Sequence, residues 1–378
     1  MPKIHRILDI NSILEKKSLF LLGPRATGKS YLIRQQLPNV PVIDLLNNRF
    51  FLQLSAAPWE LEQFIEGQSV VVIDEVQRIP DLLNEVHRLI ETKQIRFLLT
   101  GSSARKLRHK GINLLAGRAW EARLFPFTSS EIPNFSLSRY LQYGGLPPVY
   151  LSDDPEEELY AYTETYLNME IQAEALVRKI PAFTRFLRTA ALTSGQLLNF
   201  SSVANDAGVP VSTVREYYQI LEDTLIGFLL PAWSKSIKRK AIHAAKFYFF
   251  DVGIKNVLGN IKSLDPGSDQ YGYAFEHFIA QELRAYLSYR RIREPLSYWQ
   301  AKNGQEVDFI IGDDIAIEVK TAARLSTKHL KGLRALEEEK ICKKYYLISC
   351  DPAPQKTGNI EALHWQDFLQ RLWLDKIL

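Results

Sequence analysis

The stretch Gly23 to Ser30, GPRATGKS, constrains this chain more than any other part of the sequence. It matches the pattern G-x-x-x-x-G-K-[ST] and lies between the apolar run KSLFLL and the helix-like YLIRQQL. In a strand–loop–helix, glycines let backbone N–H groups turn toward phosphate oxygens, and the helix N-terminus adds positive potential. Lys29 can reach the β- and γ-phosphates of ATP, and the Ser30 hydroxyl can ligate Mg²⁺. The predicted nucleotide-binding residues are Gly23, Pro24, Arg25, Ala26, Thr27, Gly28, Lys29 and Ser30.

Two acidic residues end the apolar run in SVVVIDEVQ. Apolar residues before Asp74 and Glu75 are typical of a central parallel strand whose carboxyl end faces a nucleotide. Asp74 is predicted to hold Mg²⁺ through water, and Glu75 to act as the catalytic general base on the attacking water. A further run, IRFLLTGSS, ends in Thr100 and Ser102, which could sense the γ-phosphate or simply end a solvated strand.

The order of apolar runs predicts an α/β fold. Strands are expected near residues 17–22, 40–45, 69–74 and 95–100, with helices beginning near Lys29, Trp59 and Pro80. Residues 152–230 are mostly helical in pattern, and strand patterns return after Pro231. We therefore expect a P-loop ATPase domain with a parallel sheet over residues 1–130, a helical region over 131–230 and a second α/β domain over 231–378.

Composition narrows the class of protein. A chain of 378 residues is too long for one ordinary core. Its 47 basic and 43 acidic residues nearly balance, so any affinity for nucleic acid must come from local clusters. Two cysteines make no disulfide framework. The start, MPKIHRILDINSILEKKS, lacks the apolar region of a signal peptide, and the apolar runs are strand-sized. These features predict a cytoplasmic protein without a membrane partner.

Four segments together resemble the AAA-type P-loop "predicted ATPase" family of bacteria and archaea. They are GPRATGKS, VVVIDEVQ, LLTGSS and LLAGRAW, in that family's order. The resemblance spans the chain and implies a C-terminal domain of unknown function. It also assigns Arg118, in LLAGRAW, to a γ-phosphate site, either in cis or from a neighbouring subunit of a homo-oligomer. A surface salt bridge is the other interpretation of Arg118.

The middle of the chain carries a helix-turn-helix pattern in SSVANDAGVPVSTVREYYQILED, followed by TLIGFLLPAW, which could add the hairpin of a winged helix. In DNA-binding examples the second helix enters the major groove, here with Ser212, Thr213, Arg215 and Glu216. Only one of these is basic. The run KSIKRKAIHAAK is the better electrostatic candidate for DNA contact, although packing or a solvated face explains either element as well.

Residues 305–320, QEVDFIIGDDIAIEVK, predict a β-hairpin that turns at Gly312-Asp313-Asp314. Pairing Ile311 with Ile315 sets Asp308 opposite Glu318, and two carboxylates that close repel unless a cation lies between them. Lys320 follows on the same face. The spacing D-x₉-E-x-K on adjacent strands predicts a Mg²⁺ site with a lysine beside it. The alternative is a solvent-facing hairpin with a Glu318–Lys320 pair.

That spacing resembles the core of the PD-(D/E)xK nuclease superfamily, a restriction-endonuclease-like fold. The resemblance implies metal ligands Asp308 and Glu318, a catalytic Lys320 that assists the attacking water, and Mg²⁺ or Mn²⁺ as the ion. It also implies a glutamate on a preceding helix, and Glu276 in YAFEHFIAQELRAYL stands there. The chain departs from the motif because Glu306-Val307 replaces the usual Pro-Asp pair.

The sequence thus predicts an ATP-hydrolysing protein whose nucleotide state controls a metal-dependent nuclease-like domain acting on DNA. Two alternatives stay open. The chain could be an ATP-dependent regulatory switch whose C-terminal domain binds DNA or protein without cutting. It could also be a remodelling AAA ATPase that works as a ring.

Overall fold

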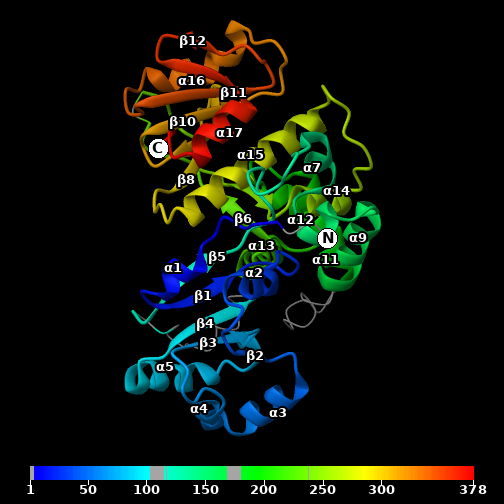
Figure 1. Cartoon of the computed structure of the whole chain (residues 1–378). Coiled ribbons are helices and arrows are strands. Elements are labelled where there is room, and N and C mark those ends of the chain that lie inside the picture. The colour runs from blue at the N-terminus through cyan, green and yellow to red at the C-terminus, as the bar shows by residue number, and fades with distance from the viewer. Residues whose placement is uncertain (1–3, 103–114, 116, 168–179, 237) are drawn as a thin grey trace. The chain divides into compact units, whose positions relative to one another are not determined.

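The computed structural model describes residues 4–102, 115, 117–167, 180–236 and 238–378, and Figure 1 labels its helices and strands. The chain forms two compact units. The N-terminal unit ends at Phe127 and also includes Asp223–Ile226, while the C-terminal unit is made of Thr128–Glu222 and Gly227–Leu378. The finer division into domains at residues 130 and 230 stays a prediction.

Five parallel strands form the sheet of the N-terminal unit, in the order β2-β3-β4-β1-β5. They are β1 (Ser18–Leu22), β2 (Val42–Asp44), β3 (Val70–Asp74), β4 (Arg96–Gly101) and β5 (Ala119–Arg123). The four strands predicted from apolar runs are confirmed. The edge strand β5 was not predicted, because AWEAR is not an apolar run and only Ala122 in it is buried.

Short helices connect these strands (Figure 1): α1 (Ile10–Leu14), α2 (Lys29–Gln36), α3 (Asn48–Ala56), α4 (Leu61–Phe64) and α5 (Leu82–Lys93), with 3₁₀ turns η1 (Pro58–Glu60) and η2 (Val76–Arg78). The predicted helix starts near Lys29, Trp59 and Pro80 are confirmed to within two residues. Leu54, Leu61 and Val86 pack in one buried cluster with Val71 and Phe97 of the sheet. This cluster fixes the strands whose ends carry the predicted nucleotide site.

The first part of the C-terminal unit is helical, as predicted. It contains α7 (Leu137–Tyr143), α8 (Pro147–Tyr150), α9 (Pro155–Ala161), a π-helical turn η3 (Tyr162–Leu167), α11 (Ile180–Leu192), α12 (Phe200–Ala207) and α13 (Val211–Asp223). A further helix, α14 (Val252–Leu258), comes after the two strands described next. Helices α12 and α13 occupy the predicted helix-turn-helix. The strands that follow, β6 (Gly227–Leu230) and β7 (Lys246–Phe249), pair antiparallel. A winged helix stays a prediction for this region.

A six-stranded mixed sheet, in the order β12-β13-β11-β10-β9-β8, forms the rest of this unit. Its strands are β8 (Leu296–Gln300), β9 (Glu306–Ile311), β10 (Ile315–Val319), β11 (Lys344–Ser349), β12 (Gln355–Thr357) and β13 (Ile360–His364). Ile311 pairs with Ile315, which confirms the predicted hairpin register. Strand β10 also pairs parallel with β11, so the hairpin lies inside the sheet rather than at a solvent-facing edge.

Helices cover both faces of this sheet. They are α15 (Asp269–Tyr289), α16 (Lys331–Glu337) after the 3₁₀ turn η4 (Thr327–Leu330), and α17 (Trp365–Trp373). Tyr345 and Leu347 of β11 pack in a cluster with α16, while the intervening Tyr346 contacts Phe368 of α17. The longest described helix is α15, with 21 residues. Across the described ranges, no helix combines the length and apolar character needed to cross a membrane.

Gly332 of α16 allows this helix to lie directly against β9. A Cβ atom at Gly332 would lie 1.9 Å from the carbonyl oxygen of Glu306, a backbone atom that cannot turn away. We therefore expect Gly332→Ala to destabilise the C-terminal unit by about 1–3 kcal/mol, as overpacking does. Urea unfolding measures this. Gly272→Ala is the control, because nothing lies within 4 Å of its added Cβ, and a helical alanine should stabilise slightly. Equal effects of the two substitutions would contradict the close packing of α16.

Candidate functional site

The predicted phosphate loop lies at the carboxyl edge of the parallel sheet, between β1 and α2. Ala26 and Gly28 both have left-handed backbone angles, with φ of +62° and +93°, so the loop curls before the helix begins at Lys29. The Lys29 ammonium donates to the carbonyl oxygens of Gly23, at 2.7 Å, and Pro24, at 3.1 Å. The side chain therefore folds back along the loop, where it can exchange these carbonyls for phosphate oxygens.

Ser30 and Asp74 meet across this edge. The Ser30 Oγ lies 3.2 Å from Asp74 Oδ2, and the Thr100 hydroxyl bonds to the other carboxylate oxygen of Asp74. Because β3 and β4 are parallel neighbours, their carboxyl ends bring Asp74 and Thr100 together. A serine hydroxyl and a carboxylate side by side are the oxygen ligands that Mg²⁺ prefers. Thr100 is thus a buried hydrogen-bond partner of the Asp74 carboxylate and not a solvated strand end.

The backbone of Glu75 has a strained left-handed conformation, and hydrogen bonds hold both its backbone and its carboxylate in place. Its φ is +59°, a left-handed conformation that costs of order 1–3 kcal/mol in a non-glycine residue and clusters at functional sites. Its backbone N–H donates to Thr100 Oγ1 at 3.0 Å. The carboxylate accepts hydrogen bonds from Gln77 Nε2 and from Ser102 Oγ, the latter at 3.4 Å. Ser102 therefore orients Glu75 in this structure.

Two residues of this site were missed by sequence reasoning. Gln77 holds Glu75, and its buried Oε1 has no hydrogen-bond partner among the described residues. Arg6, which is 2% exposed, donates to the carbonyl oxygens of Thr27, at 2.7 Å, and Phe125, at 2.6 Å. It thereby braces the phosphate loop from outside. Gln77 belongs to the segment VVVIDEVQ, so its place beside Glu75 could have been inferred from the sequence. Nothing in the sequence links Arg6 to Thr27.

Arg118 lies far from the phosphate loop within the chain. Its neighbour Ala119 pairs with Ser18 at the amino end of β1, whereas the loop follows the carboxyl end of the same strand. The Arg118 side chain forms an ion pair with Glu91 of α5. The structure therefore does not bring Arg118 to the γ-phosphate position of its own chain, because parallel strands begin at the edge opposite the loop. A contribution in trans stays a prediction.

The C-terminal candidate site is built on the hairpin β9–β10. The paired residues of the hairpin end at Phe309–Ile317, so Asp308 and Glu318 lie directly beyond the last pair, and each of these acids is 5% exposed. Asp308 Oδ2 accepts the backbone N–H of Val319 at 2.7 Å. The Lys320 ammonium lies 2.6 Å from Glu318 Oε1 and 3.8 Å from Asp308 Oδ2. The three residues are brought together as predicted. The Glu318–Lys320 pair of the alternative is present too, but its solvent-facing placement is wrong because Asp308 and Glu318 are buried.

Glu276 approaches the same site from α15. Its Oε1 accepts from the Tyr248 hydroxyl and lies 3.2 Å from the Lys246 ammonium, which is also 2.6 Å from Glu306 Oε1. Lys246, from β7, was predicted only as part of a basic surface run. It is instead 3% exposed and paired with two carboxylates. Its place could not be inferred because it depends on how β7 meets α15.

These side chains line a cavity of about 340 Å³, together with Tyr273, Gln196, Gln300 and the backbone near Gly195. Burial first, and then the charge of Asp308, raises the pKa of Glu318 well above its usual value. Burial also raises the pKa of Glu276, although Lys246 opposes that rise. Burial lowers the pKa of Lys320, but Asp308 and Glu318 outweigh it, so the net direction is upward. Burial thus disfavours the charged forms of Glu318 and Glu276, and the neighbouring ammonium groups oppose that effect.

The donor set fits a divalent cation in its chemistry. Its groups are buried carboxylates, and the Glu318 Oε2 atom is buried without a hydrogen-bond partner in the described structure. However, the ammonium groups of Lys246 and Lys320 already contact these carboxylates. Among the described residues, no three Asp, Glu, His or Cys side chains are grouped so as to hold a metal ion. Joint metal binding by Glu276, Asp308 and Glu318 stays a prediction.

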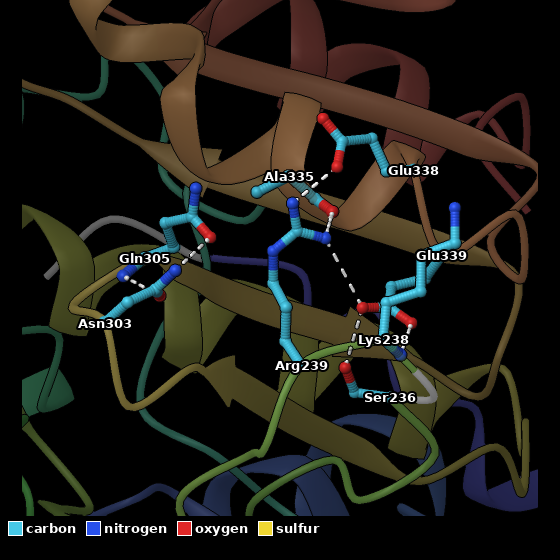
Figure 2. A network of polar contacts seen from close by, with 8 residues as sticks. All are labelled: Ser236, Lys238, Arg239, Asn303, Gln305, Ala335, Glu338 and Glu339. Atoms are coloured by element: carbon cyan, nitrogen blue, oxygen red, sulfur yellow. Dashed lines mark hydrogen bonds and ion pairs between the residues drawn. The ribbon is translucent and has the colours of Figure 1, made fainter.

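The basic run at residues 235–246 is largely paired within the C-terminal unit. Figure 2 shows Arg239 extended toward α16, where it donates to the Ala335 carbonyl at 2.9 Å and to Glu338. Glu339 accepts from Ser236 Oγ at 2.9 Å and from the Lys238 backbone at 2.8 Å. Lys235 pairs with Asp313 at 2.5 Å. The run therefore ties this segment to the mixed sheet, although Lys235, Lys238 and Lys240 are exposed among its described cations.

Three family descriptions match successive parts of the chain. Residues 15–133 match "AAA domain", residues 134–265 match "Domain of unknown function (DUF8612)", and residues 271–368 match "Domain of unknown function (DUF4143)". The "AAA domain" match covers the phosphate loop, Asp74 and Glu75. The DUF4143 match covers Glu276, Asp308, Glu318 and Lys320, whereas Lys246 belongs to the DUF8612 range.

Relatives exist in bacteria and archaea. The chain is 29% identical to "Uncharacterized protein Rv2008c" of Mycobacterium tuberculosis over 316 residues, which cover 80% of this chain and 70% of that protein. It is 26% identical over 354 residues to "Uncharacterized protein MJ1637" of Methanocaldococcus jannaschii, covering 80% and 71% of the two chains.

Two solved structures show weaker likeness. The Thermotoga maritima RuvB Holliday junction branch migration motor aligns with 16% identity over 59% of this chain and 90% of its own, at a TM-score of 0.32. The Aeropyrum pernix ORC1 protein, solved in complex with DNA, aligns with 12% identity over 65% and 87%, at a TM-score of 0.26. Scores this low carry no argument about function. The sequence matches assign an AAA-type P-loop ATPase domain to residues 15–133 and a DUF4143 domain, whose function is unknown, to residues 271–368.

Proposed function

We propose that the N-terminal unit binds ATP with Mg²⁺ on its phosphate loop and hydrolyses it. The observation that carries the proposal is the meeting of Ser30, Asp74 and Thr100 beside the loop, with Glu75 held next to them. Lys29 and the loop N–H groups bind the phosphates, Ser30 and Asp74 hold the ion, and Glu75 takes the proton of the attacking water. An AAA domain fits both binding and hydrolysis.

Lys29→Ala tests the binding step. The substitution removes the ammonium that folds back along Gly23 and Pro24, so we expect affinity for ATP to fall by at least about tenfold and hydrolysis to be lost. Fluorescence anisotropy of a labelled ATP analogue measures affinity, and phosphate release measures turnover. Lys16→Ala, which removes an exposed lysine of the same unit, should leave both unchanged. Wild-type affinity in Lys29→Ala would exclude this loop as the nucleotide site.

For the C-terminal unit we propose metal-dependent cleavage of DNA phosphodiester bonds, controlled by the nucleotide state of the ATPase. The support is a single cavity in which the buried carboxyls of Asp308 and Glu318 meet the partly exposed Lys320, with Glu276 reaching the same cavity from α15. Asp308, Glu318 and Glu276 are the residues that would hold Mg²⁺ or Mn²⁺. Such an ion, when bound, polarises the phosphodiester and acidifies water.

Lys320 then has a defined task. Although burial lowers the pKa of Lys320, Asp308 and Glu318 raise it, so its ammonium form is favoured. The ammonium would donate hydrogen bonds to the water or the phosphate oxygens and stabilise the negative charge that develops there. Asp308 keeps its orientation through the Val319 N–H, which fixes the carboxylate that faces Lys320.

One observation favours a second candidate function. Ammonium groups already neutralise the carboxylates of the cavity, and the described residues offer no ready group of three metal ligands. This is the arrangement expected of an ATP-dependent switch whose C-terminal unit binds DNA or a protein and cuts nothing. The two functions differ in one result, namely whether DNA is cut by a process that depends on Asp308.

A further inference from the structure

A basic groove lies over the start of α16, in the C-terminal unit. Its volume is about 370 Å³, and three cations line it, namely Lys328, Lys331 and Arg334. They follow one another at intervals of three residues, so they share one face of the helical segment formed by η4 and α16. All three residues are exposed, and none of them forms an ion pair with another residue that the structure describes.

The acid that lines this groove does not offset the three cations. Glu338 accepts a hydrogen bond from Arg239, which also donates to the Ala335 carbonyl at 2.9 Å, as Figure 2 shows. Like charges one helical turn apart destabilise a helix. A row of exposed cations whose neighbouring acid is engaged by another arginine produces a positive local potential, which attracts a polyanion.

The groove borders the acidic cavity of the proposed function. Gln305 lines the groove, and the next residue, Glu306, lines the cavity. Gly332, which directly follows Lys331, is close to the acids as well, since a Cβ atom at Gly332 would lie 3.4 Å from Glu318 Oε2. A ligand held by the cations of α16 therefore lies beside the buried carboxyls.

The remaining side chains of the groove indicate which polyanion fits. The Gln305 amide and the Thr327 hydroxyl can donate hydrogen bonds, and such groups commonly contact phosphate oxygens. The described residues that line the groove include no aromatic ring on which a base could stack. From Lys328 to Arg334 the helical segment rises by about 10 Å, and one DNA strand carries a phosphate about every 3.4 Å along its axis. The groove therefore suits the phosphates of a strand rather than its bases.

We propose that this groove binds the sugar–phosphate backbone of a DNA strand, without sequence preference, and holds the strand beside the acidic cavity. Lys328, Lys331 and Arg334 neutralise phosphates, while Gln305 and Thr327 donate hydrogen bonds to them. The inference rests on the proposed action of the C-terminal unit on DNA, and it adds the surface that holds the substrate. Binding here needs no metal ion, because the cations belong to the chain.

The test measures binding of labelled single-stranded and duplex oligonucleotides to the full chain by fluorescence anisotropy, in EDTA and without ATP. Lys328→Gln/Lys331→Gln/Arg334→Gln should weaken binding by at least about tenfold. The slope of log affinity against log salt should fall by about 2–3, roughly one for each lost phosphate contact. Oligonucleotides of unrelated sequence should respond alike. Because the three side chains are exposed, thermal melts should show this variant to be as stable as the wild type.

Two controls separate the position of a charge from its loss. Arg334→Lys keeps the charge in the groove, so its affinity for DNA should stay within about threefold of the wild type. A second variant loses the same charge from exposed lysines elsewhere in the unit, and its affinity should also stay within about threefold. That variant is Lys262→Gln/Lys356→Gln/Lys376→Gln.

The outcomes separate this inference from the proposed cleavage. Wild-type DNA binding in the groove variant overturns the inference, and Asp308-dependent cutting would then leave the proposed function standing. DNA that is held through the groove but never cut supports the inference and favours the non-cutting switch. If the groove variant loses affinity for labelled polyglutamate and not for DNA, the groove belongs to an acidic protein and the inference fails. No DNA binding by the wild type overturns both.

Discussion

Glu75→Gln should lower ATP hydrolysis by about 10²–10⁴-fold while ATP still binds, because the amide can occupy the site of the carboxylate but cannot accept a proton. The structure strengthens this expectation. Gln77 and Ser102 both contact the Glu75 carboxylate, and its backbone is held in a left-handed conformation by Thr100. A side chain so firmly positioned beside Asp74 and Ser30 can face the γ-phosphate of a nucleotide on the loop.

The measurement is phosphate release under single-turnover conditions, with affinity for a labelled ATP analogue measured in parallel. Glu66→Gln, an exposed glutamate of the same unit, is the matched control and should behave as the wild type. Lost binding in Glu75→Gln would instead assign this residue to the metal or the loop. Wild-type turnover in Glu75→Gln would move the general base to another group.

Asp308→Asn should abolish metal-dependent DNA cleavage, by at least about 100-fold, since even indirect partners of a metal ligand commonly cost 10–100-fold. The protein should not become less stable. Asparagine can still accept the Val319 N–H through its side-chain oxygen, and it removes a charge that repels the buried Glu318. Lost cleavage with an equal or higher melting temperature would identify Asp308 as a functional residue rather than a structural one.

The assay offers single-stranded, duplex and branched DNA with Mg²⁺ or Mn²⁺, with and without ATP. Lys29→Ala run beside the wild type shows whether nucleotide controls cutting. If no substrate is cut while ATP is still hydrolysed, the nuclease proposal fails and the switch replaces it. If Asp308→Asn cuts as the wild type does, the activity belongs to another site or to a contaminant.

The sequence predicts local features of this chain well. The phosphate loop, the four central strands and the hairpin register all depend on residues close together along the chain: a glycine pattern, apolar runs and a turn at Gly312. The burial of Asp308 and Glu318 was harder, because it depends on β11, which pairs with β10 from 25 residues further along. The hairpin alone was compatible with a solvent-facing surface.

The features that sequence reasoning missed are contacts between distant segments. Arg6 meets Thr27 and Phe125, and Lys246 meets Glu276 and Glu306, and no local pattern signals either contact. Arg118 shows how strand direction limits the position of a residue. Arg118 precedes β5, whereas the phosphate loop follows β1, and the two strands are parallel. The start of β5 and the end of β1 therefore lie at opposite edges of the sheet, which argues against contact between Arg118 and the loop of its own chain.

The position of Lys246 also bears on how such proteins diversify. The cavity takes its acids from the DUF4143 range and Lys246 from the DUF8612 range, so neither stretch specifies the charge of the cavity by itself. A recombination event that joined the same DUF4143 stretch to a different preceding region would keep every acidic residue and lose the lysine. The descendant would have the same four carboxyl groups with one cation fewer, so the charge balance of the cavity would change without a substitution in the stretch that carries the acids.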